Sequence, residues 1–217
     1  MAEKTDILKN TVTSERVTID KAKNYEKKRF TISYRMRRLD RLEKAFALQA
    51  LKMLGNAAHI VDVPCGDGRF FYIFSNAKKL TMIDYSENML AVAKEKTGNP
   101  QNVDFVRADI SNLPLPDHCA ELCFCMRLFH HMEDDHIRLT ALRELVRISR
   151  KYVALSFYNK SCLRFYRRKL LGKKIRGCYV TFTHFIELAN QAGLKFIKRI
   201  PIVNTIEPQC LVIFEKA

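Results

Sequence analysis

Hydrophobic positions change their spacing several times along this chain, and each change predicts a different element. From Met36 to Leu54 the apolar residues recur every three to five positions and end before Gly55, which predicts an amphipathic helix. Beyond it, short apolar runs alternate with helical stretches. The predicted strands lie at 59–65, 80–86, 103–109, 120–129 and 151–159, and the predicted helices between them at 70–77, 88–98 and 134–149. This alternation predicts an α/β fold built on a doubly wound, parallel sheet.

The two ends of the chain depart from this alternation. Near the C-terminus, a helix at 182–193 is followed by two apolar runs, at 194–203 and 209–217, with no helix between them. Strands joined by so short a loop pair antiparallel, so we expect a seven-stranded sheet, mostly parallel, with an antiparallel C-terminal pair. Residues 1–24 are polar and aperiodic and predict a mobile or loosely docked tail. We therefore divide the chain into an N-terminal tail and helical cap, 1–57, and a main domain, 58–217.

With 47% hydrophobic and 28% charged residues, the 217-residue chain has the composition of a single soluble globular domain. No apolar run approaches the roughly 18 residues that a membrane-spanning helix needs, and residues 1–10 resemble neither a signal nor a transit peptide, so we expect a cytoplasmic protein. Its seven cysteines include no C-x-x-C pair, and its six histidines have no metal-binding spacing. This predicts buried, reduced thiols and no metal site.

Positive charge is concentrated in one part of the sequence. The formal net charge is +15, and the stretch from Arg147 to Arg176 holds eleven Lys or Arg and no Asp or Glu. Such a field favours an anionic partner, which includes nucleic acid, an acidic metabolite and an anionic membrane face. A well-solvated surface explains it equally.

The segment VDVPCGDG, from Val61 to Gly68, follows the first predicted strand and allows two interpretations. Its Pro-Cys pair suggests a nucleophilic thiolate at Cys65, whereas its glycines suggest a loop that closes over a ligand. Ligands of open α/β sheets bind beyond the carboxyl ends of the strands. Gly66 and Gly68 would let the backbone pass close to such a ligand, and the next helix offers free N–H groups.

Acidic residues at the ends of the next two strands favour the ligand loop. Asp84 ends one strand, where a carboxylate can accept hydrogen bonds from ribose hydroxyls, and Asp109 ends the other, where it can accept one from an exocyclic amine. Either residue alone also fits a helix cap or a turn. Together with Asp62 and Gly66 they fall at one edge of the sheet, which capping explains poorly. Cys65 is then a small residue beneath the ligand.

Four segments occur in the order of a known family: VDVPCGDG, IDYS, RADISNLPLPD and RLFHHMEDD. From about Ala58 to the C-terminus the chain resembles the class I S-adenosylmethionine-dependent methyltransferases, in the branch that includes the ubiquinone and menaquinone biosynthesis methyltransferases. The resemblance implies a Rossmann-like fold, S-adenosylmethionine as cofactor and S-adenosylhomocysteine as product. The cofactor residues that it implies are Asp62, Gly66 and Gly68 on the methionine side, Asp84 on the ribose, and Tyr85, Asp109 and Ile110 around the adenine.

One loop position departs from the family's D-x-G-x-G-x-G. Pro64 stands where the first glycine belongs, so a φ fixed at about −65° and a missing N–H must suit a place beside the cofactor. A dinucleotide site is disfavoured, because G-x-G-x-x-G would fall on Pro64, Gly66 and Arg69. Candidates for the cofactor's carboxylate are Arg127, Arg69, Arg29 and Arg35.

Methyl transfer from a sulfonium is an in-line displacement, in which the protein aligns the acceptor and, for a hydroxyl, removes a proton. His131 and, second, His130 follow the fourth strand and are candidates for this base, because an imidazole titrates near working pH. The pair could equally pack or cap the turn before the helix at Asp134. Base methylation is disfavoured, because Met126–Phe129 replaces the D/N-P-P-Y/F segment of amino-nucleobase enzymes, and Cys123 and Cys125 lie inside a strand as core thiols.

A basic insert at 160–177 lies where this family commonly builds a lid over the acceptor. Leu163, Tyr166 and Leu170 share one helical face, and Gly172 ends the helix. Three interpretations stay open: a lid over an acidic or amphipathic acceptor, a patch that faces RNA or an anionic membrane, and a solvated helix with an apolar inner face. The basic residues of the insert include Arg164, Arg167, Arg168, Lys169, Lys173, Lys174 and Arg176.

We therefore expect a methyltransferase that acts on a small, anionic or amphipathic molecule, at oxygen. The alternatives are an RNA methyltransferase and a non-catalytic protein that binds S-adenosylmethionine or S-adenosylhomocysteine and uses the basic insert to bind RNA or a partner.

Overall fold

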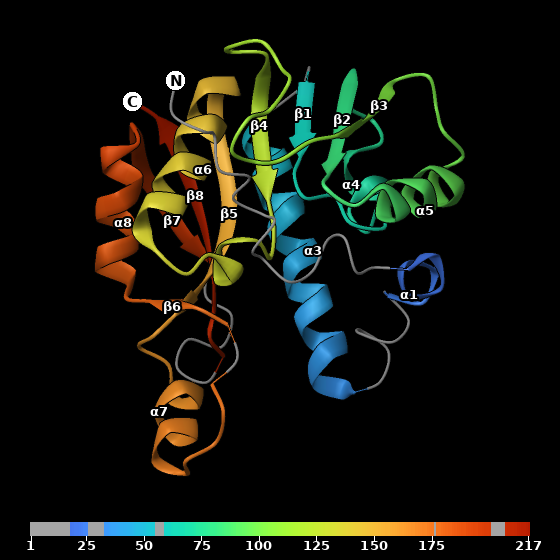
Figure 1. The fold of residues 1–217 in the computed structure, drawn as a ribbon. Helices are drawn as coiled ribbons and strands as arrows, with labels where there is room; N and C mark the ends of the chain where they lie inside the picture. The colour runs from blue at the N-terminus through green and yellow to red at the C-terminus, as the bar shows by residue number, and fades with distance from the viewer. Residues whose placement is uncertain (1–17, 26–32, 55–58, 176, 201–206) are drawn as a thin grey trace, which may run out of the picture.

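The computed structural model describes residues 18–25, 33–54, 59–175, 177–200 and 207–217. Its centre is an eight-stranded sheet with helices on both faces (Figure 1). The strands are β1 His59–Asp62, β2 Lys79–Asp84, β3 Val103–Arg107, β4 Ala120–Cys125, β5 Ser149–Asn159, β6 Tyr179–Val180, β7 Leu194–Ile200 and β8 Gln209–Lys216. Seven of them follow the order β3-β2-β1-β4-β5-β8-β7, and the short β6 pairs with β5 beside this path.

Strand direction confirms the predicted fold class. The first five strands run parallel, with Val61 of β1 paired to Thr81 of β2 and to Cys123 of β4. Strand β8 turns back between β5 and β7 and is antiparallel to both. The chain runs outward from β1 to β3 and then returns to β4. The carboxyl ends of β1 and β4 therefore flank the point of reversal at which open α/β sheets bind ligands.

Strand β6 is an addition to the seven predicted strands. Tyr179 and Val180 pair with Tyr158 and Asn159 at the end of β5. Two residues are too few for an alternating pattern to show, so the sequence could not predict this strand.

Successive residues of a strand enter different cores. Ile60 packs in a core with three helices on one face of the sheet, and Val61 packs in a core with two helices on the other. This is the alternation that a two-sided parallel sheet requires. The helices on the face of Ile60 are α3 Tyr34–Leu54, α4 Phe71–Phe74 and α5 Glu87–Thr97. Those on the face of Val61 are α6 Asp135–Ile148 and α8 Phe182–Gln191.

Part of the predicted N-terminal tail is a docked helix. Residues 19–23 form helix α1 (Ile19–Lys23), whose Ala22 is fully buried against Met89 and Val92 of α5. Of the two alternatives, a mobile or a loosely docked tail, this segment therefore favours the docked one. A single small apolar residue seats the helix on its neighbour and leaves no period in the sequence for the pattern to show. Residues 1–17 lie outside the described part of the chain.

The basic insert forms helix α7 (Leu163–Leu170), and its apolar residues divide differently from the expectation. Phe165 is buried and its ring lies 5.1 Å from that of Tyr179, whereas Leu163, Tyr166 and Leu170 are exposed. The interpretation of those three as an inner face is therefore wrong. The cause is the position of the helix, which projects beyond the end of the sheet instead of lying on it (Figure 1).

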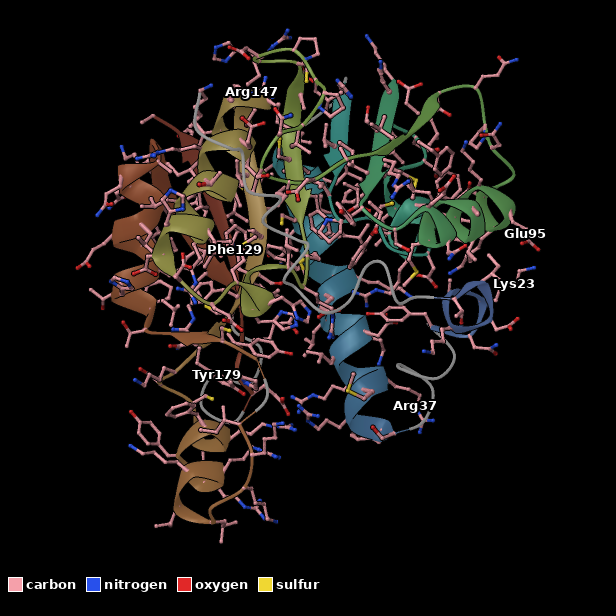
Figure 2. All side chains as sticks on the ribbon, in the orientation of Figure 1. Lys23, Arg37, Glu95, Phe129, Arg147 and Tyr179 are labelled. Atoms are coloured by element: carbon pink, nitrogen blue, oxygen red, sulfur yellow. The ribbon has the colours of Figure 1, made fainter. Side chains whose placement is uncertain are left out.

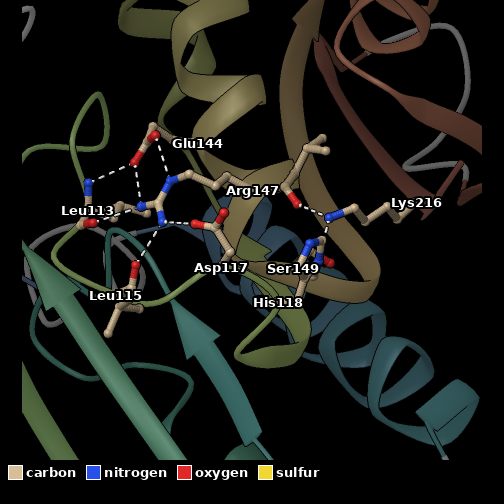
Figure 3. Close-up of polar contacts among 9 residues, drawn as sticks. Leu113, Leu115, Asp117, His118, Glu144, Arg147, Ser149 and Lys216 are labelled. Atoms are coloured by element: carbon tan, nitrogen blue, oxygen red, sulfur yellow. Dashed lines mark hydrogen bonds and ion pairs between the residues drawn. The ribbon is translucent and has the colours of Figure 1, made fainter.

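Arg147 and Lys216 bind backbone carbonyls at the amino end of the sheet, which is opposite the carboxyl edge (Figure 3). Arg147 at the end of α6 donates to the carbonyls of Leu113 and Leu115, both at 2.8 Å. The Nζ of Lys216 donates to the carbonyls of Val146 and Ser149 at 2.8 and 3.0 Å. These charges bind backbone carbonyls of the loop before β4 and of the junction between α6 and β5. They are structural and lie far from the carboxyl edge.

The cysteines confirm the prediction of reduced thiols, because all seven are free and five are buried. The buried ones are Cys65, Cys123, Cys125, Cys162 and Cys210. Among the helices that the structure describes, none has the length and apolar content needed to cross a bilayer.

Candidate functional site

The loop after β1 continues the pairing of that strand before it turns. The N–H of Val63 donates to the carbonyl of Phe124 at 2.9 Å, and that of Cys65 donates to the carbonyl of Ile83 at 2.8 Å. Pro64, which offers no N–H, is half-buried between these two bonds. The loop is thus fixed between β4 and β2, at the edge where the strands end.

Both glycines of the loop adopt left-handed backbone conformations. Gly66 has φ +58° and Gly68 has φ +80°, which L side chains rarely adopt. A Cβ on Gly68 would lie 3.4 Å from side-chain atoms of both Ala93 and Met82, so this glycine lets α5 and β2 pack against the loop. A Cβ on Gly66 would meet no atom of the described chain within 4 Å. Gly66 therefore borders open space, and this is where the loop can approach a ligand.

Asp84, at the end of β2, ties the loop to the next turn. Its carboxylate accepts from the N–H of Gly66 and from the N–H of Ser86, each at 2.9 Å. Burial raises the pKa of Asp84 to about 6, against the lowering effect of these backbone donors. Ser86 in turn caps α5 by accepting from the N–H of Met89. Asp84 is therefore not the cap of α5. Ser86 caps this helix, and Asp84 holds the glycine loop in place.

Asp62, at the end of β1, is a buried carboxylate. It is 1% exposed, and neither oxygen has a hydrogen-bond partner among the residues that the structure describes. Burial raises its pKa well above the usual range; the charge of Arg69 opposes this effect, and that of Asp84 adds to it. A carboxylate in such a place requires a cation or donors to remain ionised.

Cys65 does not have the surroundings of a nucleophile. It is 3% exposed, and burial, together with the negative charges of Asp84 and Asp62, raises the pKa of its thiol well above the usual value. A thiolate needs the opposite environment, with positive charge and access to solvent. This favours the ligand-loop interpretation of VDVPCGDG.

The three residues predicted around an adenine are brought to the same edge but differ in exposure. Tyr85 is half-buried, with the guanidinium of Arg107 5.9 Å from its ring. Asp109 is half-buried and accepts from the N–H of Ser111 at 2.8 Å, so it also seats a turn. Ile110 is 1% exposed and packs in the core. Its side chain is structural in this arrangement, which leaves only its backbone for a ligand.

Arg127, a candidate for the cofactor's carboxylate, is held by a glutamate from the N-terminal helix. Glu43 of α3 is fully buried, and its carboxylate lies 2.8 Å from Nη2 of Arg127 and 2.5 Å from Nη2 of Arg69. Arg69 also donates to Asp40 at 2.6 Å. Arg69 follows the glycine loop and Arg127 follows β4, so Glu43 joins α3 to both loops. Arg35 pairs instead with Glu207, and Arg29 lies outside the described residues.

This glutamate was not predicted, although the sequence carries a sign of it. The apolar stripe of α3 that faces the sheet is interrupted by one acid, which any count of core positions would mark as a charge in need of a buried partner. The stripe consists of Leu39, Glu43, Phe46, Ala47 and Ala50.

The two histidines lie at the end of β4 in a short 3-10 helix, Phe129–His131. The ring of His130 stacks on Tyr158 at 4.1 Å and also lies 4.1 Å from the ring of His131. His130 is 4% exposed, whereas His131 is half-buried. The helix that follows is capped by Asp134, which accepts from the N–H of Ile137 at 2.9 Å, so the histidines are not its cap. His130 packs, and His131 is the more accessible of the two.

Comparison with known proteins agrees with this geometry. Residues 60–151, which run from β1 into β5, match the family described as the methyltransferase domain. The structure of magnesium protoporphyrin IX methyltransferase from Synechocystis with bound S-adenosylhomocysteine superposes with a TM-score of 0.73 at 13% identity, over 91% of this chain and 97% of that one. Residues 60–151 therefore match a methyltransferase domain, and the chain has a fold that is found in methyltransferases. A methyltransferase from Aquifex aeolicus shares the fold, with a TM-score of 0.63 at 20% identity over 93% of this chain and all of that one.

Two sequence relatives of this chain are methyltransferases by name. The chain is 30% identical over 120 residues to the ubiquinone/menaquinone biosynthesis C-methyltransferase of Pseudomonas fluorescens, which is 51% of this chain and 44% of that protein. It is 32% identical over 111 residues to the demethylmenaquinone methyltransferase of Staphylococcus aureus, 48% of this chain and 45% of that protein. The chain thus spans less than half the length of these two relatives.

The described residues at the carboxyl edge could hold an S-adenosyl cofactor. The buried oxygens of Asp62 would receive the positive charge that the cofactor's ammonium carries, and the open space at Gly66 admits a ligand against the loop backbone. Asp84 would accept from ribose hydroxyls beside its two backbone donors. The Synechocystis enzyme with the same fold holds S-adenosylhomocysteine, the product that the sequence predicts for this chain.

Proposed function

We propose that this chain transfers a methyl group from S-adenosylmethionine to a small, anionic or amphipathic acceptor. The observation that carries the proposal is the bracing of the glycine loop by Asp84, at the reversal point of a methyltransferase-like sheet. A carboxylate fixed there against two backbone N–H groups is preorganised. Binding of a ligand that donates to it therefore costs little conformational entropy of the protein. Asp62, Pro64, Gly66, Gly68, Asp84, Tyr85, Asp109 and the backbone of Ile110 are the proposed cofactor-binding residues.

Arg127 has a supporting part in this proposal. Because its guanidinium already pairs with Glu43, it would meet the cofactor's carboxylate only as a shared cation between two acids. Its backbone is held as well, since its N–H donates to the hydroxyl of Ser156 at 2.8 Å. We therefore assign Arg127 first to the order of the β4 loop and second to the cofactor.

For the acceptor, we propose oxygen as the receiving atom and His131 as the base, with His130 behind it. The cofactor supplies a methyl group on a sulfonium, whose carbon–sulfur electron pair returns to sulfur when the acceptor takes the carbon. A hydroxyl acceptor loses its proton in the same process, and the half-buried imidazole of His131 stands at the end of β4 to receive it. The relatives support an amphipathic acceptor through their names, and one of them is named as a C-methyltransferase, so carbon is the competing atom.

The experiment that tests the proposal follows a labelled methyl group. The chain is incubated with methyl-labelled S-adenosylmethionine and a cell extract, and the products are separated into small molecules, RNA and protein. We expect label in an organic-extractable small molecule, and fragmentation by mass spectrometry then distinguishes a methoxy from a C-methyl group. Label only in RNA would overturn the acceptor class, and no label in any fraction would favour a non-catalytic binding protein.

A further inference from the structure

Helix α7 presents apolar side chains to solvent. Leu163, Tyr166 and Leu170 are 59%, 57% and 87% exposed, and Leu171 directly after the helix is 52% exposed. A single exposed leucine is ordinary, but several on one short helix form a patch that monomeric proteins normally cover. Phe165 alone turns inward. The ring of Phe165 thus holds the helix in place, and the other apolar side chains of the helix are exposed to solvent.

Basic residues surround this apolar patch. Arg167, Lys169, Lys173 and Lys174 are exposed, and Arg164 and Arg168 are partly so, while no acidic residue occurs from Arg147 to Arg176. Arg168 donates to the carbonyl of Lys174 at 3.0 Å, which folds the segment after α7 back along the helix and keeps its charges together. Arg176 lies outside the described residues. An apolar stripe flanked by cations is the pattern of helices that lie in the interface of an anionic bilayer.

The first turn of α3 lies on the same side of the molecule. Tyr34 is 69% exposed, and Arg37 and Arg38 are exposed beside it. Figures 1 and 2 show this end of α3, marked by Arg37, and helix α7, with Tyr179 beside it, both extending past the carboxyl edge of the sheet. Two structurally separate segments therefore contribute aromatic, aliphatic and basic side chains to one side.

A glutamate bridges the two segments. Glu207 accepts from Nε of Arg35 at 2.5 Å and also from Nη2 of the same residue, and it lies 3.7 Å from Nη1 of Arg164 at the start of α7. The hydrogen bonds to Glu207 raise the pKa of Arg35 above its usual value. One carboxylate thus lies between two arginines, so this bridge keeps a net positive charge beside the exposed basic residues of α7.

We propose that α7 and the first turn of α3 form a docking surface for an anionic lipid membrane. Aliphatic side chains decide between lipid and RNA, because RNA is bound through cations and stacked aromatic rings and gains little from Leu163, Leu170 and Leu171. Charge decides against a second copy of this chain, because two identical basic faces repel each other. A bilayer with anionic headgroups satisfies both the leucines and the cations.

Docking in this way would turn the carboxyl edge of the sheet toward the bilayer. The glycine loop and Asp84 lie at that edge, from which α7 and α3 extend (Figure 1). An amphipathic acceptor could then reach the site from the membrane surface without crossing water. This consequence rests on the proposed function, whereas the docking itself does not.

The test is flotation of the whole chain with lipid vesicles that hold no methyl acceptor. We expect the protein to float with vesicles that contain phosphatidylglycerol, to remain behind with pure phosphatidylcholine, and to dissociate as salt screens the cations. A double variant, Leu163→Ser with Leu170→Ser, keeps every charge and should lose about tenfold in vesicle affinity through its missing apolar area. Tyr72→Ser is the matched control, because Tyr72 is a 71% exposed apolar residue on α4 and its loss should leave flotation unchanged.

Three outcomes would overturn the docking surface. One is an absence of flotation with anionic vesicles. Another is equal flotation of the double variant, and the third is a gain in mass at rising concentration that the leucine substitutions abolish, which would mean self-association. Binding of single-stranded RNA that ignores the leucines, without vesicle binding, would assign the cations to RNA. Titration of S-adenosylhomocysteine into the same double variant separates failure of docking from failure of the proposed function, because the cofactor residues are untouched.

Discussion

Single side chains at the carboxyl edge are positioned by buried charge, and Glu43 contacts two of them. Replacing it by glutamine keeps the shape but leaves the guanidinium of Arg127 without its carboxylate and Arg69 with Asp40 alone. Removing one partner of a buried pair costs about 3–5 kcal/mol, so we expect Glu43→Gln to lower the free energy of unfolding in denaturant by roughly this amount.

The matched control for Glu43 is Glu95→Gln on α5. Glu95 pairs with Lys23 at 3.1 Å, but its side chain is 67% exposed. Exposed pairs contribute about 0–1 kcal/mol, so the control should be nearly neutral. Equal losses of stability in the two variants would show that the burial of the Glu43 cluster has no energetic consequence.

Asp84 gives the site a pH dependence. Its pKa of about 6 in the unliganded protein means that the carboxyl group is protonated below that pH. Ligand hydroxyls that donate to Asp84 favour its ionised form and lower its pKa in the complex. Affinity for S-adenosylhomocysteine should therefore rise with pH up to about 6, by at most about tenfold per unit, and level off above 7. Calorimetric titration at several pH values measures this.

Asp84→Asn is the control for that titration. An amide does not ionise, so its affinity should be weaker and nearly flat over the same pH range. A wild-type profile that is itself flat would remove Asp84 from the ribose contact. A profile that falls with rising pH would contradict the sign of the argument.

The sequence predicts those site residues whose place follows from one strand, and it misses those set by distant partners. Asp62 and Asp84 end β1 and β2, and Asp109 follows β3 by two residues, so a local pattern fixes the edge at which they lie. Glu43 meets partners 26 and 84 residues further along the chain, and no local pattern specifies that approach. For Ile110, a position in a motif does not say whether the side chain points to a ligand or into the core, and the structure places this side chain in the core.

At the scale of elements, the glycine loop combines unusual backbone conformation with open space. We expect Gly66→Ala to cost about 1 kcal/mol of stability through its positive φ, and in addition to weaken S-adenosylhomocysteine binding at least tenfold. The reason is that its new Cβ enters space that the structure leaves open and the cofactor would fill. Thermal unfolding measures the first effect, and titration of the ligand the second.

Gly98 at the end of α5 is the matched position for this substitution. It has φ +74°, and a Cβ there would also lie in open space. It caps the C-terminal end of α5, whereas Gly66 lies near the other end of this helix, where Asp84 accepts from its N–H. Gly98→Ala should show a comparable loss of stability and unchanged ligand affinity. Loss of affinity in both variants would attribute the effect to stability alone.

Elements with a strong period were predicted well, and those seated by few contacts were not. The amphipathic pattern from Met36 to Leu54 became α3, and the strand runs became β1 to β5 with ends shifted by a few residues. The pattern of α7 predicted which apolar residues share a helical face, but not that this face points to solvent. Periodicity shows which residues share a face and not what that face meets. Helix α1 and strand β6 are too short to have a period.

At the scale of the whole molecule, some basic residues stabilise the fold and others lie on the surface of the described part. Arg147 and Lys216 hold backbone carbonyls at the amino end of the sheet, and Arg69 and Arg127 neutralise Glu43 within the core. Other basic residues, such as Lys78, Arg143 and Lys195, are spread over the surface, and a further group lies on α7 and the start of α3, at the carboxyl end. The net charge of +15 was visible in the sequence, but only the fold separates the structural cations from those that can attract an anionic partner.

The most direct test of the central claim, a cofactor site at the carboxyl edge, is calorimetric titration of S-adenosylhomocysteine into the whole chain and into its Asp84→Ala variant at pH 7.5. We predict saturable binding of one molecule per chain, which the variant loses or weakens by at least about tenfold, consistent with removal of a buried, charge-assisted acceptor. An absence of binding, or binding that the variant retains in full, would contradict the account.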